Sequence, residues 1–363
     1  MIKGRVRAAV TIILTVMAGF QVPEAAASNY VRYGDCRELQ PPQSSVSFDR
    51  QCDTEKSFDC AIGMAMDTVN AIDRCDRKIL SLAFIGGSIT NTGAIHGEIR
   101  KATGQRFIME MIRNLEKVPN PDIRTFVAWG TSLSIMETGD YAAARELASH
   151  LPPWANSTIH SYGALMAAKK CDASIARDLL ERADHMAAHV TTGWWKVRAY
   201  SWIARVQFLL GMEEFGTSID LAKQTMEEIP GGRNSEWGKV FYGIGLTHVG
   251  RPREAISISE NLKDPYHAAY VLSFSASSLA FRNKGEEARK IMKRADGVLS
   301  TLEDNYQRDS LKAVLAPARV LIGDASGISD IVDSFSRSRA LTRVGNVLFD
   351  QKMGVLPWSC GSI

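Results

Sequence analysis

Residues 241–255 read FYGIGLTHVGRPREA. In this stretch the small residue Gly243 precedes the turn residue Gly250 by seven positions, and a second small residue, Ala255, follows it by five. The segment before Gly250 is apolar over about three to four helical turns. The stretch therefore predicts two helices joined by a tight turn, with small side chains where the helices come closest.

The same arrangement repeats along most of the chain. The turn residues are Gly93, Gly139, Cys171, Gly211, Gly250, Asn283 and Gly323, at intervals of 46, 32, 40, 39, 33 and 40 residues. The residues seven positions before them are Gly86, Ser132, Ala164, Ala204, Gly243, Ala276 and Ala316. The residues five positions after them are Glu98, Ala144, Ala176, Gly216, Ala255, Ala288 and Ile328. Such periodicity is typical of helical-repeat proteins, whose two-helix units need about 34 to 47 residues.

Close packing explains the pattern. Two antiparallel helices approach closely only where small side chains lie between their axes, and bulky apolar neighbours fill the grooves on either side. One such pair cannot bury its faces alone, so neighbouring pairs stack and a continuous core results. We therefore predict an all-α fold, an α-solenoid of stacked antiparallel helix pairs over residues 57–350.

The repeats resemble the tetratricopeptide-repeat superfamily, which has a small residue in its first helix, a turn often containing Gly, and Ala in its second helix. The best matches are Phe241–Ala255, Thr138–Arg145 and Asn283–Arg289. The unit length varies, however, and Pro317 is expected to kink the helix before Gly323. A HEAT-like or unclassified helical array therefore remains an alternative. The resemblance implies a right-handed solenoid whose first helices line a concave groove for a peptide or a partner helix.

The first 27 residues have the features of a cleaved signal peptide. Lys3, Arg5 and Arg7 precede an uncharged, mostly apolar run of 13 residues, and small residues lead up to a cleavage site after Ala27. A membrane span needs about 20 apolar residues, which this run does not reach. We expect a periplasmic or secreted protein without a membrane span, with an irregular entry segment at 28–56 and a tail at 351–363.

The charge balance argues against two classes of partner. Without residues 1–27 the chain has 40 basic and 39 acidic residues. A nearly neutral chain gives no electrostatic reason to bind nucleic acid or an anionic membrane surface.

Six cysteines fit an oxidising compartment. They are Cys36, Cys52, Cys60, Cys75, Cys171 and Cys360. The first four lie within 40 residues, which predicts one or two disulfides there, and four cysteines allow three connectivities. Cys171 and Cys360 either pair or remain buried thiols, and we favour buried thiols.

Aromatic and basic residues gather in the first helices of the middle repeats. We predict a partner-binding groove there, formed by Trp194, Trp195, Arg198, Trp202, Arg205, Trp237, Lys239 and Tyr242. Trp and Tyr give large contact areas at low entropic cost, and the arginines could pair with ligand carboxylates. For any single aromatic residue, packing between helices is the simpler explanation. The group as a whole favours a non-enzymatic, exported module that binds a protein or peptide partner and needs no cofactor.

A serine hydrolase is one alternative. The stretch FIGGSIT around Ser88 looks like the nucleophile block of SGNH-type esterases, and Asp264-Pro265-Tyr266-His267 resembles their second block. Shifted by 46 residues, however, the segment ending at Gly93 aligns with the one ending at Gly139. Ser88 then lies in a repeat helix rather than at the end of a strand.

A structural spacer within a larger exported machine is a further alternative, and metal binding is another. His185 and His189 are four residues apart, so they share one face of a helix. Met186 stands where the zinc-protease motif requires Glu. Solvated polar side chains explain this pair equally well, and we predict no metal site.

Overall fold

The computed structural model describes residues 36, 38–42, 57–96, 98–324 and 327–352. The predicted signal peptide, most of the entry segment, Cys52, Cys360 and residues 353–363 lie outside this range.

The described part of the chain is helical and contains no β-strand, which confirms the predicted all-α class. Its helices are α3 (Phe58–Asn70), α4 (Cys75–His96), α5 (Glu98–Arg113), the short 3-10 helix η1 (Leu115–Lys117), α6 (Pro121–Thr138), α7 (Tyr141–Ala148), α8 (Pro153–Lys169), α9 (Ala173–Ala188), α10 (Gly193–Leu209), α11 (Phe215–Glu228), α12 (Arg233–His248), α13 (Pro252–Glu260), α14 (Pro265–Phe281), α15 (Gly285–Leu299), α16 (Asn305–Leu321) and α17 (Ser334–Lys352). None of these helices is long and apolar enough to cross a membrane.

Two of the described helices begin at a polar cap followed by proline. The side chain of Asn120 accepts hydrogen bonds from the backbone of Asp122 and Ile123, and Pro121 opens α6. In the same way Asp264 accepts from the backbone N–H of Tyr266 at 2.8 Å, and Pro265 opens α14. A side-chain acceptor satisfies an N–H that the helix leaves free, and proline needs no such acceptor. The Asp264-Pro265 segment is therefore the start of a helix.

The predicted turns are accurate except for the first. Gly139, Gly211, Gly250, Gly323, Cys171 and Asn283 all have positive φ angles. This left-handed conformation ends a helix, and a non-glycine residue adopts it rarely. The turn predicted at Gly93 is wrong, because Gly93 lies inside α4, which continues to His96. Glycine only weakens a helix by about 1 kcal/mol, so packing can carry a helix through it.

Small residues lie where helices pack most closely. A Cβ added to Gly86 of α4 would stand 2.7 Å from the Cβ of Phe107 and 2.9 Å from the carbonyl oxygen of Gly104, both on α5. In the repeats that follow, the small residues at the two predicted offsets are almost all buried. The buried ones are Ser132, Ala164, Ala204, Gly243, Ala276 and Ala316 before the turn, and Ala144, Ala176, Ala255 and Ala288 after it.

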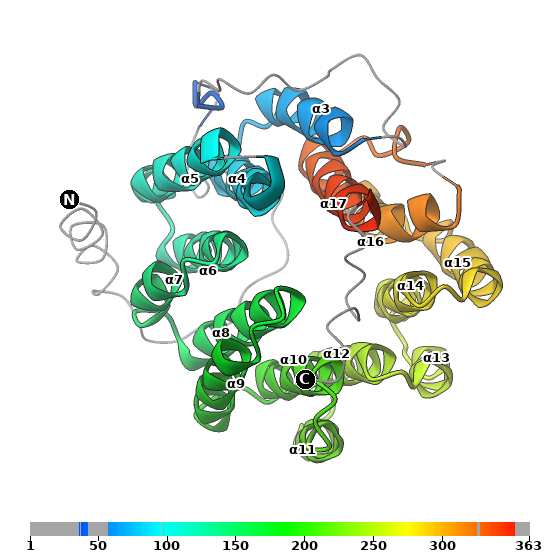
Figure 1. Ribbon diagram of the computed structural model, residues 1–363. Coiled ribbons are helices and arrows are strands. Elements are labelled where there is room, and N and C mark those ends of the chain that lie inside the picture. The colour runs from blue at the N-terminus through cyan, green and yellow to red at the C-terminus, as the bar shows by residue number, and fades with distance from the viewer. Residues whose placement is uncertain (1–35, 37, 43–56, 97, 325–326, 353–363) are drawn as a thin grey trace.

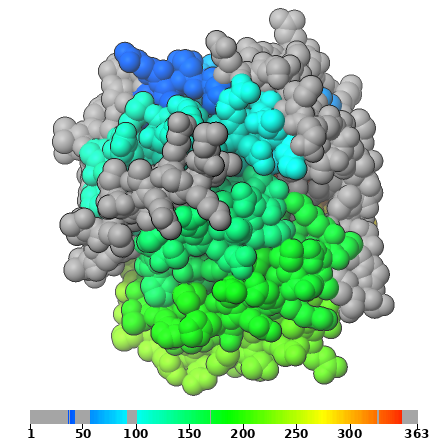
Figure 2. Space-filling view, turned by 60° about the vertical axis from the view of Figure 1, so that its left-hand side comes forward, coloured from blue at the N-terminus to red at the C-terminus, as the bar shows by residue number. Residues whose placement is uncertain are grey.

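The helices are arranged as a closed ring (Figure 1). Helices α4, α6, α8, α10, α12, α14 and α16 follow one another around its inner side, and α5, α7, α9, α11, α13 and α15 lie outside them. Neighbouring helices pack in pairs, as predicted for a helical repeat. Figure 2 shows the successive pairs stacked without interruption down one side of the molecule.

The two ends of the helical array complete the ring. The last helix, α17, packs against the first described helix, α3, and also against α4 and α16. Arg77 of α4 forms an ion pair with Asp333, just before α17, at 3.0 Å. The guanidinium of Arg77 also lies 4.4 Å from the ring centre of Tyr306 on α16. The repeat pattern of the sequence does not predict this closure of the solenoid.

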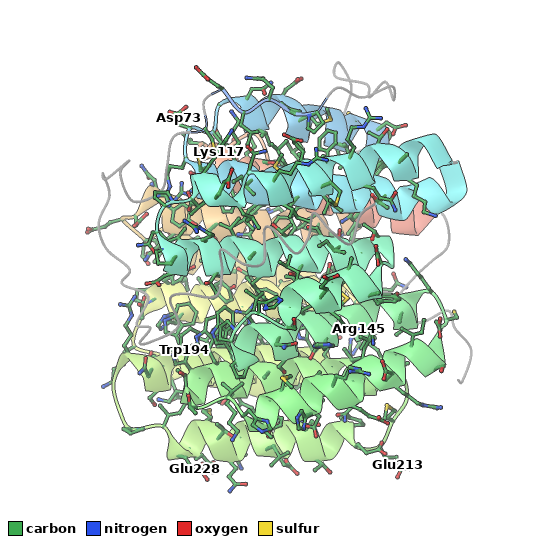
Figure 3. The ribbon with its side chains drawn as sticks, turned by 90° about the vertical axis from the view of Figure 1, so that its left-hand side faces the viewer. Asp73, Lys117, Arg145, Trp194, Glu213 and Glu228 are labelled. Carbon is green, nitrogen blue, oxygen red and sulfur yellow. A yellow bond between two sulfur atoms is a disulfide. The ribbon has the colours of Figure 1, made fainter. Side chains whose placement is uncertain are left out.

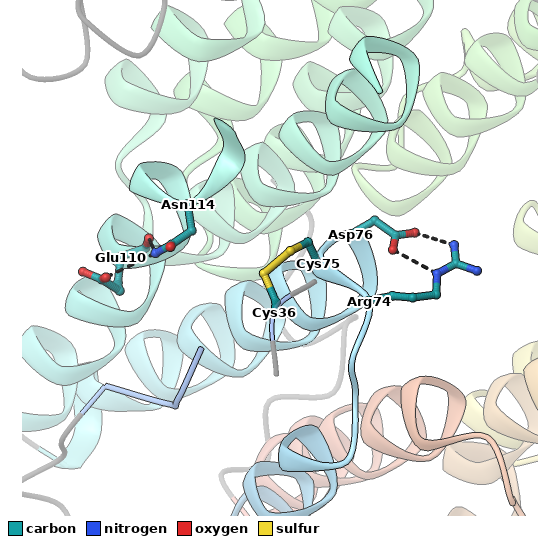
Figure 4. The surroundings of a disulfide bond; sticks show 6 residues. All are labelled: Cys36, Arg74, Cys75, Asp76, Glu110 and Asn114. Atoms are coloured by element: carbon teal, nitrogen blue, oxygen red, sulfur yellow. Dashed lines mark hydrogen bonds and ion pairs between the residues drawn. A yellow bond between two sulfur atoms is a disulfide. The ribbon is translucent and has the colours of Figure 1, made fainter. Parts of the chain in front are cut away.

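A disulfide holds the entry segment to the ring. Cys36 and Cys75 are bonded (Figure 4). The backbone N–H of Cys36 also donates to the carbonyl of Asp73 at 2.8 Å. The bond joins the entry segment to the start of α4, beside the ion pair of Arg74 with Asp76. Cys60 and Cys171 are also disulfide-bonded, so the prediction of Cys171 as a buried thiol is wrong. Cys171 is exposed at the turn after α8.

Candidate functional site

A continuous set of aromatic rings runs across the first halves of five consecutive inner helices. We call it the aromatic belt, and it consists of Phe126, Trp129, Trp154, Trp194, Trp195, Trp237, Phe241, Tyr266 and Tyr270. Trp154 stacks on Trp195 with ring centres 4.0 Å apart, and Trp194 stacks on Trp195 at 4.1 Å. Trp194, at the start of α10, lies near the same end of the ring as Asp73 and Lys117 (Figure 3). The belt therefore lies toward the end of the ring where these inner helices begin.

Helical spacing brings one face of α10 into this belt. Trp195, Arg198, Trp202 and Arg205 are separated by three, four and three residues. Side chains at such spacing share one face of a helix. The sequence therefore aligns two tryptophans and two arginines along the inner side of α10.

Arg198 is enclosed by three aromatic rings. Its guanidinium lies 5.0 Å from the ring centre of Trp129, 5.0 Å from Trp195 and 5.3 Å from Phe241. These rings come from α6, α10 and α12, so Arg198 reaches past α8 and must face the interior of the ring. Its Nε is buried without a hydrogen-bond partner, and burial lowers the pKa of Arg198 to about 10. Ring faces attract the cation but cannot neutralise it.

A second group of inward-facing residues lies further along the same helices. Arg205 lies 4.9 Å from the ring centre of Trp202. Trp202 also contacts Tyr162 of α8 and His248 of α12, with ring centres 6.2 and 5.9 Å apart. Burial lowers the pKa of Arg205 to about 10. It also lowers the pKa of His248 well below its ordinary value, and the charges of Arg205 and Arg282 add to that effect.

A carboxylate lies beside this group. The hydroxyl of Tyr162 donates a hydrogen bond of 2.5 Å to Glu137 Oε1 on α6. Burial, and then the negative charge of Glu137, raise the pKa of Tyr162 well above its ordinary value. Tyr162 therefore stays protonated and acts as a hydrogen-bond donor.

Closure of the ring adds a third arginine from α17. The guanidinium of Arg343 donates a long hydrogen bond of 3.5 Å to the carbonyl of Ala313 on α16. That carbonyl is free because Pro317, four residues later in the helix, has no N–H to donate. Burial, followed by repulsion from Arg339, lowers the pKa of Arg343 to about 10. Arg343 also interacts electrostatically with Tyr162 and Tyr270, which places it among the inward-facing residues.

We call Arg198, Arg205 and Arg343 the arginine cluster. Arg205 and Arg343 both interact with Tyr162, and Arg198 and Arg343 both interact with Tyr270. No member of the cluster forms an ion pair within the part of the chain that the structure describes. The ring interior therefore combines a broad aromatic surface with three arginines that form no ion pair among the described residues.

Two of the predicted groove residues lie apart from the belt. Tyr242 is buried, and its charged neighbours Arg251, Glu254 and Asp220 lie on or beside the outer helices α11 and α13. Lys239 Nζ lies 3.8 Å from Glu236 Oε1 on its own helix. The other six predicted residues, Trp194, Trp195, Arg198, Trp202, Arg205 and Trp237, are in the belt or in the group next to it.

The two alternative sites have simple structural explanations. Ser88 is in the middle of α4, only 1% exposed, and no strand precedes it among the residues that the structure describes. His267 lies on α14, where its Nδ1 is 3.7 Å from Glu236 Oε2 and 3.9 Å from Asp264 Oδ2. His189 Nδ1 is bonded to the carbonyl of His185 at 2.8 Å. No group of three or more potential metal ligands occurs among the described residues.

Trp154, Tyr162, Phe274 and Tyr306 were not predicted from the sequence, although they share a pattern with predicted residues such as Trp194 and Trp202. Tyr162, Trp202, Phe241 and Phe274 each lie nine positions before a left-handed turn residue. Trp154, Trp194, Tyr266 and Tyr306 each lie seventeen positions before one. These two offsets mark the inner face of the ring. Comparisons with models of protein families, with curated proteins and with solved structures find no match for this chain.

Proposed function

We propose that this chain is an exported, non-enzymatic binding module that holds a peptide segment of a protein partner against the aromatic belt. In this proposal the ring is a right-handed array of antiparallel, tetratricopeptide-like helix pairs, and the first helix of each pair supplies the binding surface. The observation that carries the proposal is the continuity of the belt across α6, α8, α10, α12 and α14.

The chemistry of the belt suits peptide binding. Trp and Tyr present large, rigid surfaces and lose little conformational entropy when a ligand binds. They are also the residues that dominate the energetics of many protein interfaces. Trp194, Trp195 and Trp237 remain partly exposed, so part of each side chain is accessible to a ligand.

Export is supported by two separate features. The first 27 residues have the composition of a signal peptide. The disulfide between Cys36 and Cys75 suits an oxidising compartment.

The experiment is affinity capture from an envelope extract of the native host. The bait is the exported protein, and the test variant carries Trp194→Ala, Trp195→Ala and Trp237→Ala. A matched control is Leu221→Ala, an exposed apolar residue on the outer helix α11. We expect the triple variant to lose a partner that the wild type and the control both recover, while its circular dichroism spectrum stays helical. Equal recovery by a correctly folded triple variant would refute the proposal.

A further inference from the structure

We propose that the arginine cluster binds the carboxylates of an acidic peptide segment, so that the partner carries Asp or Glu side chains between apolar ones. This inference rests on the proposed function and adds the chemistry of the ligand. It is motivated by three inward-facing arginines that form no ion pair with a carboxylate of the described residues.

Two other partly buried arginines of this fold pair with carboxylates. Arg319, which is 17% exposed, lies 2.6 Å from Asp296 and 3.1 Å from Asp324. Arg77, which is 22% exposed, pairs with Asp333. A half-buried arginine without a counter-ion is costly, because the interior screens its charge poorly. The arginine cluster has no such ion pair among the described residues, and a bound anion would supply one.

The donors of the cluster are already oriented. Arg198 is held by three rings, Arg205 by the ring of Trp202, and Arg343 by the carbonyl of Ala313. Fixed guanidinium groups lose little entropy when they form a bidentate pair with a carboxylate. Glu137 Oε1 accepts a hydrogen bond from the hydroxyl of Tyr162, so this carboxylate already has a partner next to the cluster.

The belt favours a peptide over a nucleic acid. Nucleobases bind by stacking on open ring faces. In the belt several ring faces are covered by neighbouring rings, since Trp195 stacks on both Trp154 and Trp194, and Trp194 also stacks on Phe241. What remains is a contiguous apolar surface that suits Leu, Ile or Phe side chains next to carboxylates.

The test compares two fluorescein-labelled decapeptides by fluorescence anisotropy with the mature full chain. One peptide alternates Glu with Leu, and the other has Gln in place of every Glu. We expect the wild type to bind the Glu peptide at least about 30-fold more tightly than the Gln peptide, because half-buried charge pairs contribute strongly to affinity. Raising the salt concentration should weaken the binding of the Glu peptide but not that of the Gln peptide.

Two variants locate the effect. Arg205→Gln and Arg343→Gln should each reduce the preference for the Glu peptide by about 10-fold or more. Arg289→Gln, which removes an exposed arginine paired with Glu286 on α15, should leave the preference unchanged. If the cluster variants unfold, the comparison of the two peptides on the wild type still decides the question.

Equal affinity of the wild type for both peptides would overturn the acidic-peptide inference and leave the proposed function standing. Stronger binding of an oligothymidylate than of the Glu peptide would also overturn it. Failure of both peptides to bind, together with unchanged capture by the tryptophan variant, would overturn the inference and the proposed function together.

Discussion

Arg77 and Asp333 form an ion pair of 3.0 Å although 256 residues separate them in the sequence. Both side chains are only about a fifth exposed. The pair joins the first inner helix, α4, to the residue that precedes the last helix, α17. It therefore links the two ends of the array, and with the packing of α17 on α3 it turns a stack of helix pairs into a ring.

The coupling between these two residues should be measurable. We expect Arg77→Ala and Asp333→Ala to destabilise the protein, and Asp333→Ala to cost more, because Asp333 also accepts a 2.7 Å hydrogen bond from the backbone N–H of Ser336 at the start of α17. A double-mutant cycle in urea should give a coupling energy of about 0.5 to 1 kcal/mol. Strictly additive effects would show that the pair does not stabilise the closure.

The disulfide of the entry segment should also stabilise the fold. Cys36 and Cys75 are 39 residues apart in the sequence. Chain entropy then predicts a loss of about 3 to 4 kcal/mol in the double variant Cys36→Ala, Cys75→Ala. Substitution is preferable to a reducing agent, because Cys60 and Cys171 are disulfide-bonded too. A thermal midpoint equal to that of the wild type would contradict this expectation.

Replacing glycine by alanine should change the stability of the protein in opposite directions at two glycines inside helices. Gly86→Ala places a Cβ 2.7 Å from Phe107 Cβ and should destabilise the protein by about 1 to 3 kcal/mol. Gly297→Ala in α15 meets nothing within 4 Å, and it should stabilise the protein by about 0.5 to 1 kcal/mol through helix propensity. Denaturant unfolding of the two variants measures both changes in stability. If Gly86→Ala is as stable as Gly297→Ala, the close approach of α4 and α5 is incorrect.

His248 should make the fold sensitive to acid. Its pKa in the folded protein lies well below the ordinary value, because burial and then Arg205 and Arg282 disfavour the imidazolium. The unfolded chain, with a histidine pKa of about 6.5, therefore takes up the proton first, and stability falls as the pH falls below about 6.5. We expect the free energy of unfolding to fall less in His248→Gln than in the wild type when the pH is lowered from about 7.5 to 5.5. His160 and His267, whose pKa values are also lowered by burial, remain in both proteins. An identical loss in the two proteins would rule out this role of His248.

Local features of this fold could be predicted from the sequence. The turns at Cys171 and Asn283 were placed correctly without a glycine, because a small residue seven positions before and another five positions after each turn fix the register. The turn at Gly93 failed because helix packing overrides the weak preference of one glycine. Local chemistry thus predicts the repeats but not the point at which a helix of 22 residues ends.

The candidate site was predictable only in part. Neighbours in sequence point in different directions on a helix, about 100° apart per residue. Tyr242 therefore faces the outer helices while Phe241 joins the belt. Arg343 could not be assigned to the site at all, because only closure of the ring brings it within electrostatic range of Tyr162 on α8 and Tyr270 on α14. Closure depends on small rotations summed over all helix pairs, which no local pattern encodes.

Closure of the ring by α3 and α17 is the claim on which the interior site depends, and a cross-link tests it directly. A Cβ at Gly345 would lie 3.4 Å from Ala61 Cβ, close to the separation found in disulfides. We predict that the variant Ala61→Cys, Gly345→Cys forms a 61–345 disulfide under oxidising conditions, seen by tandem mass spectrometry of a non-reduced digest. A folded variant that yields peptides with residues 61 and 345 unlinked would contradict the ring, and with it the joining of Arg343 to Arg198 and Arg205 in one site.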